Sequence, residues 1–232
     1  MTTSVIITGA SSGIGAAAAR RFQAEGARVL NLSRRPCPVD GVEHVTCDLA
    51  SDTADRVLAN EVKPWLADNG PLVVIHNAAR LDKDTVRDTS ADALRSVLEI
   101  NVVAAQRLNT LVMDALRPGS AVLYVGSTLS EKAVAGTFTY VTSKHAVVGM
   151  MRATCQDLAG TGVHTACICP GFTDTDMLRS HVPGDVLPAL GDMSAFGRLV
   201  TPEEIADTLW FASRNPVVNG AVLHANLGQI ER

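Results

Sequence analysis

Apolar residues recur along the chain in short runs separated by longer stretches of mixed polarity. These runs are rich in Val, Ile and Leu, which is typical of β-strands, and several are almost continuously apolar, as burial on both faces of a sheet requires. We predict strands at Val5–Thr8, Arg28–Ser33, His44–Cys47, Leu72–His76, Ala121–Gly126, Val163–Cys169 and Ala221–Ala225.

Most of the intervening stretches are long enough for a helix. Thr201 is a candidate N-cap, with Pro202 in the first turn and Glu204 three residues after the cap. Strands that alternate with helices predict an α/β fold, in which a doubly wound parallel sheet carries helices on both faces within one domain over residues 1–232. The predicted helices are Gly13–Glu25, Thr53–Asp68, Ala91–Leu116, Phe138–Leu158 and Pro202–Ser213.

The least regular stretch runs from Thr173 to Arg198. It follows the carboxyl end of a predicted strand, which is where open α/β sheets bind ligands, so we predict a lid, with a plain surface loop as the alternative. Its helix breakers are Pro183, Gly184, Pro188, Gly191 and Gly197.

Charge and composition favour a small-molecule partner. The formal net charge is -4 and no segment is a basic block, so no nucleic-acid or membrane surface is predicted. The first residues lack a basic region and a long apolar stretch, and no segment approaches the ~20 apolar residues of a membrane span. We therefore expect a cytoplasmic protein.

Cysteines and histidines give no sign of a metal site. The five cysteines lack Cys-x-x-Cys spacing, and the six histidines lack the spacing of metal ligands. Cys167 and Cys169 are expected to point to opposite faces of their strand and not to pair.

A glycine cluster follows the first strand and begins the first helix. Glycines permit a tight turn and let backbone N–H groups approach a pyrophosphate at the helix N-terminus. Because the cluster lies in a strand-turn-helix unit, we predict a dinucleotide site, although a mere tight turn is the alternative. Its residues are Gly9, Ser11, Ser12, Gly13, Ile14 and Gly15.

Tyr140 and Lys144 are four residues apart on a predicted helix and share one face. A nearby cation favours the phenolate, which would bring the phenol pKa below its usual ~10, although a solvated surface pair is the alternative. Ser127 ends the fifth strand, where its hydroxyl can bind a substrate oxygen or serve only a turn. Asn101 lies inside a long helix, where it is otherwise a satisfied buried amide.

These motifs together resemble the short-chain dehydrogenase/reductase family across essentially the whole chain. The likeness is to the single-domain type of about 250 residues that includes 3-oxoacyl-ACP reductases. The region from Phe196 to Ala206 also resembles the segment before the penultimate helix of these enzymes. The motif residues, in family order, are Gly9, Gly13, Gly15, Asp48, Asn77, Ala78, Asn101, Ser127, Tyr140, Lys144, Pro170 and Gly171.

The resemblance implies a Rossmann-type, mostly parallel, seven-stranded sheet and a nicotinamide-dependent oxidoreductase. Tyr140 would be the acid in reduction and the base in oxidation, and Lys144 would lower its pKa and hold the nicotinamide ribose. Ser127 would position the carbonyl, and Asn101 would hold a water of a proton relay. Further implied cofactor contacts are Asp48, Leu49, Asn77, Ala78, Ala79, Pro170, Gly171 and Thr173.

Two residues depart from the family pattern Asn-Asn-Ala-Gly. Ala79 adds a methyl group where backbone and cofactor would approach, and His76 either tunes the site or, as we favour, fills the end of its strand.

The loop after the second strand predicts a preference for NADP(H). NAD enzymes usually carry an acidic residue there for the ribose 2′-hydroxyl, whereas this chain has Ser33, Arg34 and Arg35. A guanidinium can bind a 2′-phosphate through paired, charge-assisted hydrogen bonds. Arg34 is the expected ligand, with Ser33 adding a hydroxyl and Arg35 stacking or facing water.

Hydride transfer to a ketone or an oxoacyl thioester is the leading functional hypothesis. The alternatives are a catalytically silent nucleotide sensor or scaffold, and the sugar-nucleotide epimerisation of longer relatives. A homotetramer is expected from pairing of the helices Ala91–Leu116 and Phe138–Leu158, the first carrying apolar Leu94, Val97, Leu98 and Val102. An apolar substrate pocket or ordinary core is predicted for Val134, Phe138, Phe172, Met177 and Leu178.

Overall fold

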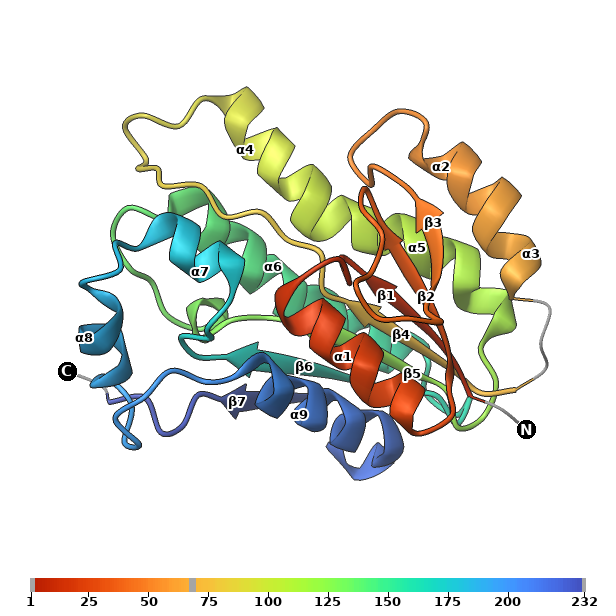
Figure 1. Ribbon diagram of the computed structural model, residues 1–232. Helices are drawn as coiled ribbons and strands as arrows, with labels where there is room; N and C mark the ends of the chain where they lie inside the picture. Colours follow the sequence, from red (N-terminus) through yellow and green to blue (C-terminus); the bar gives the residue numbers. More distant parts are fainter. Residues whose placement is uncertain (1–2, 67–69, 231–232) are drawn as a thin grey trace.

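A seven-stranded parallel sheet forms the centre of the molecule (Figure 1). The computed structural model describes residues 3–66 and 70–230. The strand order is β3-β2-β1-β4-β5-β6-β7, and every neighbouring pair is parallel. This confirms the expected Rossmann-type fold class. The strands are β1 (Ser4–Thr8), β2 (Arg28–Ser33), β3 (Glu43–Thr46), β4 (Leu72–His76), β5 (Ala121–Val125), β6 (His164–Pro170) and β7 (Ala221–Ala225).

Helices cover both faces of the sheet, because the strands are apolar on both sides. Helices α1 (Gly13–Ala24) and α9 (Pro202–Arg214) pack together over one face, where Phe22, Ile205 and Leu209 are fully buried (Figure 1). Thr201 and Glu204 form the expected capping box at the start of α9. The other face carries α2 (Ala54–Val57), α3 (Lys63–Trp65), α4 (Ala91–Leu98), α5 (Ala104–Val112) and α6 (Phe138–Asp157).

Two helices predicted as continuous are interrupted. The predicted helix Ala91–Leu116 divides into α4, the π-helical turn η2 (Glu99–Val103), α5 and the 3-10 turn η3 (Met113–Ala115). The predicted helix Thr53–Asp68 likewise contains the π-helical turn η1 (Leu58–Val62) between α2 and α3, while Asp68 lies outside the described residues. A π turn inserts one residue without changing the apolar pattern enough to be recognised, so the sequence did not reveal it.

Thr173 to Arg198 contains two short helices that were not predicted, α7 (Asp176–His181) and α8 (Leu187–Gly191). Thr175 caps α7 by accepting from the backbone N–H of Leu178 at 3.3 Å. Two 3-10 turns complete the elements, η4 (Thr128–Ser130) and η5 (Pro216–Val218).

The expectation that Cys167 and Cys169 point to opposite faces of their strand was wrong. Their Sγ atoms lie 3.9 Å apart, and both residues are fully buried in β6. Side chains two residues apart on a strand point to the same face, so the two thiols are neighbours beside Gly126. A Cβ on Gly126 would lie 2.7 Å from either sulfur, which explains the glycine there.

The carboxyl ends of β1 and β4 meet where the chain changes direction across the sheet. From β1 the connections run outward to β2 and β3, and from β4 they run the other way to β7. The connections leave in opposite directions at this point, which opens a crevice at the strand ends. Throughout residues 3–66 and 70–230, no helix is long and apolar enough to cross a membrane.

Candidate active site

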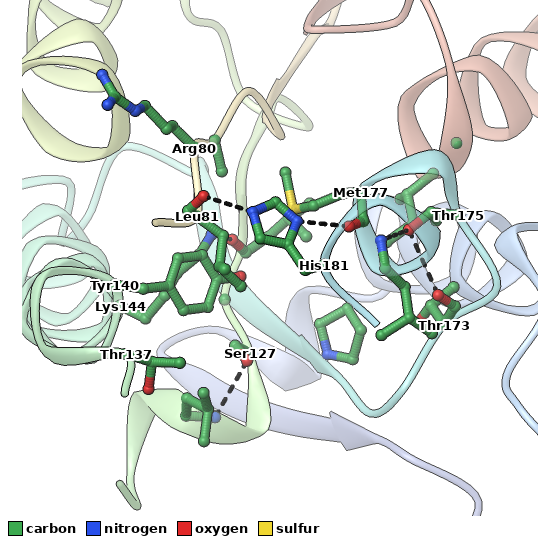
Figure 2. A pocket seen from close by; sticks show the side chains of 18 of the residues that line it. Arg80, Leu81, Ser127, Thr137, Tyr140, Lys144, Thr173, Thr175, Met177 and His181 are labelled. Carbon is green, nitrogen blue, oxygen red and sulfur yellow. Dashed lines mark hydrogen bonds between the residues drawn. The ribbon is translucent and has the colours of Figure 1, made fainter. Parts of the chain in front are cut away.

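A cleft of about 2120 Å³ opens at the carboxyl ends of the strands. Figure 2 shows part of its wall, with Tyr140, Lys144 and Ser127 drawn from α6 and the end of β5. Of the predicted site residues, Gly15 and Asn101 lie outside the lining. The others line it: Gly9, Ser11, Ser12, Gly13, Ile14, Ser33, Arg34, Arg35, Asp48, Leu49, Asn77, Ala78, Ala79, Ser127, Tyr140, Lys144, Pro170, Gly171 and Thr173.

The glycine loop forms a cradle at the N-terminus of α1. Gly9 and Gly13 have φ values of 73° and 53°, a region that side chains disfavour. Ser12, the N-cap, makes no side-chain cap hydrogen bond, so N–H groups of the first turn are available to an anion. A Cβ on Gly15 would collide with the carbonyl oxygen of Gly9 and lie 2.6 Å from Asn77 Nδ2. These features fit a dinucleotide pyrophosphate.

Two strand residues that the sequence analysis did not single out hold this loop in place. Thr8 Oγ1 accepts hydrogen bonds at 3.0 Å from the backbone N–H groups of both Asn77 and Ala78. Asn31 Oδ1 accepts at 3.0 Å from the backbone N–H of Ala10. The available signal was a polar residue inside an otherwise apolar strand, since a buried polar side chain needs a partner.

The loop after β2 presents two arginines at the other end of the cleft. Arg34 and Arg35 are exposed, and neither has a carboxylate ion-pair partner among the described residues. Ser33 Oγ donates to the carbonyl oxygen of Arg35 at 2.5 Å. Asp48 accepts from the backbone N–H of Ala50 at 3.1 Å. Both residues lie in the loop after β3, which also lines the cleft.

Helix α6 carries the Tyr-Lys pair into the cleft. Tyr140 and Lys144 are 8% and 3% exposed. Lys144 Nζ donates to the carbonyl oxygen of Val125 at 2.7 Å and lies 5.5 Å from the centre of the Tyr140 ring. The ammonium is thus buried beside the phenol ring.

Ser127 occupies the turn directly after β5. Its Oγ accepts from the backbone N–H of Leu129 at 3.1 Å, and Ser130 completes a capping box there. The hydroxyl proton of Ser127 is therefore left to donate to an oxygen in the cleft.

Asn101 lies behind the cleft in the π turn η2. Its amide accepts from the N–H of Arg80 at 2.8 Å and donates to the carbonyl oxygen of Arg80 at 2.9 Å. It also donates to Ser143 Oγ at 2.8 Å. Asn101 therefore links the loop after β4 to the helix that carries Tyr140.

The same loop makes two more contacts that sequence reasoning missed. Asp84 Oδ1 accepts from the backbone N–H of Thr139 at 3.2 Å, so it caps α6 from a distant segment where Thr137 provides no cap. His181 Nε2, at the end of α7, lies 2.9 Å from the carbonyl oxygen of Leu81 (Figure 2). These contacts tie α6 and α7 to one loop.

The apolar residues near the site divide between the cleft and the surface. Val134, Phe172, Met177 and Leu178 line the cleft, whereas Phe138 does not and is 36% exposed. Within the described part of the chain, no group of three or more His, Cys, Asp or Glu residues could hold a metal ion.

Comparison with known proteins gives full-length matches. The family described as Enoyl-(Acyl carrier protein) reductase matches residues 9–229. The short-chain reductase protein NovJ of Streptomyces niveus is 30% identical over 97% of this chain and 92% of its own length. The 3-oxoacyl-[acyl-carrier-protein] reductase MabA of Mycobacterium tuberculosis is 27% identical over 97% and 92%. A variant of actinorhodin polyketide ketoreductase, solved with NADPH, is 26% identical with a TM-score of 0.85 over 98% of this chain and 97% of that one.

Proposed function

Because the chain belongs to the short-chain dehydrogenase/reductase family, we propose that it is an NADP(H)-dependent oxidoreductase acting on a ketone or secondary alcohol. The observation that carries the proposal is one cleft lined by Tyr140, Lys144 and Ser127 together with the glycine loop. The bound dinucleotide would donate or accept the hydride at this cleft.

The side chains of this chain would handle the proton. In reduction, Tyr140 donates its phenolic proton to the substrate oxygen as charge develops there, while Ser127 donates a hydrogen bond to the same oxygen. Lys144 stabilises the resulting phenolate, because its ammonium is buried beside the ring. Asn101 fixes the loop after β4 against α6.

The substrate class we propose is a small apolar carbonyl compound or a 3-oxoacyl thioester. The support is the apolar lining from Phe172, Met177 and Leu178, and the similarity to MabA and to a polyketide ketoreductase.

The test is NADPH oxidation with a panel of ketones and 3-oxoacyl thioesters. Tyr140→Phe should lower kcat by about 100-fold or more, since general acid catalysis contributes at least that much. NADPH binding, followed by nucleotide fluorescence, should change little in this variant. Equal turnover by variant and parent would contradict the mechanism. Tight NADPH binding without turnover across the whole panel would favour a silent sensor or scaffold.

We propose the preference for NADP(H) from the exposed Arg34 and Arg35 and from the absence of an acid at the end of β2. Charge-assisted hydrogen bonds contribute about 1.5–3 kcal/mol, which corresponds to roughly 10- to 150-fold in affinity. Arg34→Ala should lower kcat/KM for NADPH by a factor in this range and leave that for NADH nearly unchanged. Arg35→Ala is the matched control and should have the smaller effect. A parent preference for NADH would overturn the assignment.

A further inference from the structure

His76, at the carboxyl end of β4, begins a buried chain of hydrogen bonds. Its Nε2 lies 2.7 Å from Asn109 Oδ1, and Asn109 Nδ2 donates to the Tyr124 hydroxyl at 2.8 Å. That hydroxyl lies 3.1 Å from Thr154 Oγ1, which donates its own proton to the carbonyl oxygen of Met150. Thr154 therefore accepts from Tyr124, and Asn109 presents its carbonyl oxygen to the imidazole. It follows that His76 Nε2 carries the ring proton.

The second ring nitrogen of His76 is an acceptor without a protein partner. Nδ1 then bears a lone pair, and it is buried without a hydrogen bond to any described residue. Burial lowers the pKa of His76 to about 4, so the imidazole is neutral near pH 7. A buried acceptor without a partner is destabilising, so a donor is expected nearby.

A small cavity of about 10 Å³ adjoins His76. This volume is about the least that can hold one water molecule. Lys144 and Asn101 line the same cavity, as do Thr8, Tyr124 and Val125. The Lys144 ammonium has three protons, and its hydrogen bond to the carbonyl oxygen of Val125 uses one of them. Donor, acceptor and space for a bridging molecule thus occur together behind the cleft.

We propose that this cavity binds one water molecule, which accepts a hydrogen bond from Lys144 Nζ and donates one to His76 Nδ1. His76 is then a positioning residue: it acts through the water to hold the ammonium beside Tyr140. Its consequence for catalysis rests on the proposed function, whereas the water site and its effect on Tyr140 do not. His76 is one of the two residues at which this chain departs from the family pattern, so the proposed arrangement of His76, water and Lys144 is particular to this protein.

The titration of Tyr140 in the cofactor-free protein tests the positioning role. The chain has two tyrosines, and burial raises the pKa of Tyr124. The tyrosinate absorbance near 295 nm that is lost in Tyr140→Phe is assigned to Tyr140. The other titratable groups around Lys144 are His76 on β4 and Cys167 on β6, and the hydrogen bond to Cys169 together with burial raises the pKa of Cys167. His76 and Cys167 each keep one charge state through the neutral range. Cys169, whose Sγ lies 3.9 Å from that of Cys167, has its pKa lowered to about 6 by the hydrogen bond to Cys167, so its charge is the same in parent and variants at any one pH.

His76→Leu removes the acceptor and should raise the pKa of Tyr140 by about half a unit to one unit, because the ammonium is held less firmly. Thr154→Val is the matched control: it breaks the same buried chain at its far end and should leave the pKa of Tyr140 unchanged. An unchanged pKa in folded His76→Leu, or equal shifts in both variants, would overturn the positioning role.

A high-resolution crystal structure of the parent protein provides a second measurement that does not depend on a variant folding. The expected result is a water within about 3.2 Å of both Lys144 Nζ and His76 Nδ1. A dry cavity would refute the proposal. Because neither measurement uses turnover, a protein that reduces no carbonyl compound could still show the water and the shift, which separates this proposal from the proposed function.

Discussion

Gly15 illustrates how a single missing side chain sets the geometry of the cofactor cradle. It lies outside the cleft lining, and its role is to let the loop, Asn77 and the start of α1 approach one another closely. We expect Gly15→Ala to destabilise the fold by about 1–3 kcal/mol, as overpacking does, because the added methyl group meets backbone atoms that cannot move alone. NADPH affinity should fall about 10-fold or more as N–H groups leave the pyrophosphate.

The control for Gly15 is Gly184→Ala, at a glycine with nothing within 4 Å of an added Cβ. Its free energy of unfolding in urea should stay within about 1 kcal/mol of the parent. If Gly15→Ala were as stable as Gly184→Ala and bound NADPH equally well, the close approach would have no functional importance.

His76 should also make stability depend on pH. Its pKa is about 4 in the folded protein against an ordinary value of 6.5, so the unfolded chain binds more protons between these limits. Stability therefore falls as pH falls through this window, by about 2 kcal/mol between about pH 7.5 and about pH 5. Urea unfolding at both values should show that loss in the parent and a smaller one in His76→Leu. The exposed His145 is the control, and His145→Gln should retain the full loss.

At the scale of single residues, the sequence could predict the residues that belong to motifs but not the residues that hold those motifs in place. Tyr140, Lys144 and Ser127 were found because they occur together with the other motifs in the order and approximate spacing of one family. Thr8 and Asn31 were not, because their partners lie 69 and 21 residues away in the chain and only folding reveals them. The sulfurs of Cys167 and Cys169 were misplaced through an error in strand geometry that the alternation of side chains corrects.

At the scale of helices and strands, prediction is limited because the periodicity of apolar residues is an average over several turns of a helix. Strand positions were predicted well because each apolar run coincides with a strand, and five of these strands are buried along nearly their whole length. The π turn η2 was invisible, yet it is the part of its helix where Asn101 binds both the N–H and the carbonyl group of Arg80. π turns are frequent at functional sites, where they redirect one side chain without ending the helix. Short helices such as α7 likewise lack enough residues for a periodic signal.

Helix α7 should restrain the bound dinucleotide. It begins beside the glycine loop, where a Cβ on Gly13 would lie 3.2 Å from Thr175, and it ends where His181 meets the carbonyl oxygen of Leu81 across the cleft (Figure 2). His181→Ala removes that link. We expect the Kd for NADPH to rise about 3- to 10-fold, the equivalent of one hydrogen bond, because the helix opens more readily.

Arg179→Ala is the control for the α7 link, since Arg179 lies on the same helix but is exposed and pairs with Asp174 within its own segment. It should leave the Kd nearly unchanged. Equal weakening by both substitutions would mean that helix stability, and not the contact with Leu81, controls binding.

For the whole molecule, alternation of strands and helices predicted layers but could not supply the strand order. That order arises from the crossovers, and it is what brings residues from β1, β4, β5 and α6 to one edge. The family resemblance provided this information before the structure did. It also implied pairing between subunits, which a single chain does not display.

We propose a homotetramer, because α4 to α6 leave apolar side chains facing outward. Val97, one of the four residues first considered for pairing, is fully buried within the chain, and Leu94, Leu98 and Val102 are partly buried. Val103, at the end of η2, is 38% exposed, and Met113 is 37% exposed on the same long helical segment. A second subunit packed there would remove this apolar surface from water.

Light scattering at micromolar concentration should give a mass about four times 24.4 kDa. Val103→Asp places a charge in the proposed interface and should shift the protein toward smaller species, because burying an unpaired charge is costly. Val86→Asp is the control, at a valine that is 72% exposed in the loop before α4 and outside both helices. A monomeric parent would refute the helix pairing, while a dimer would be consistent with the pairing and would rule out the tetramer.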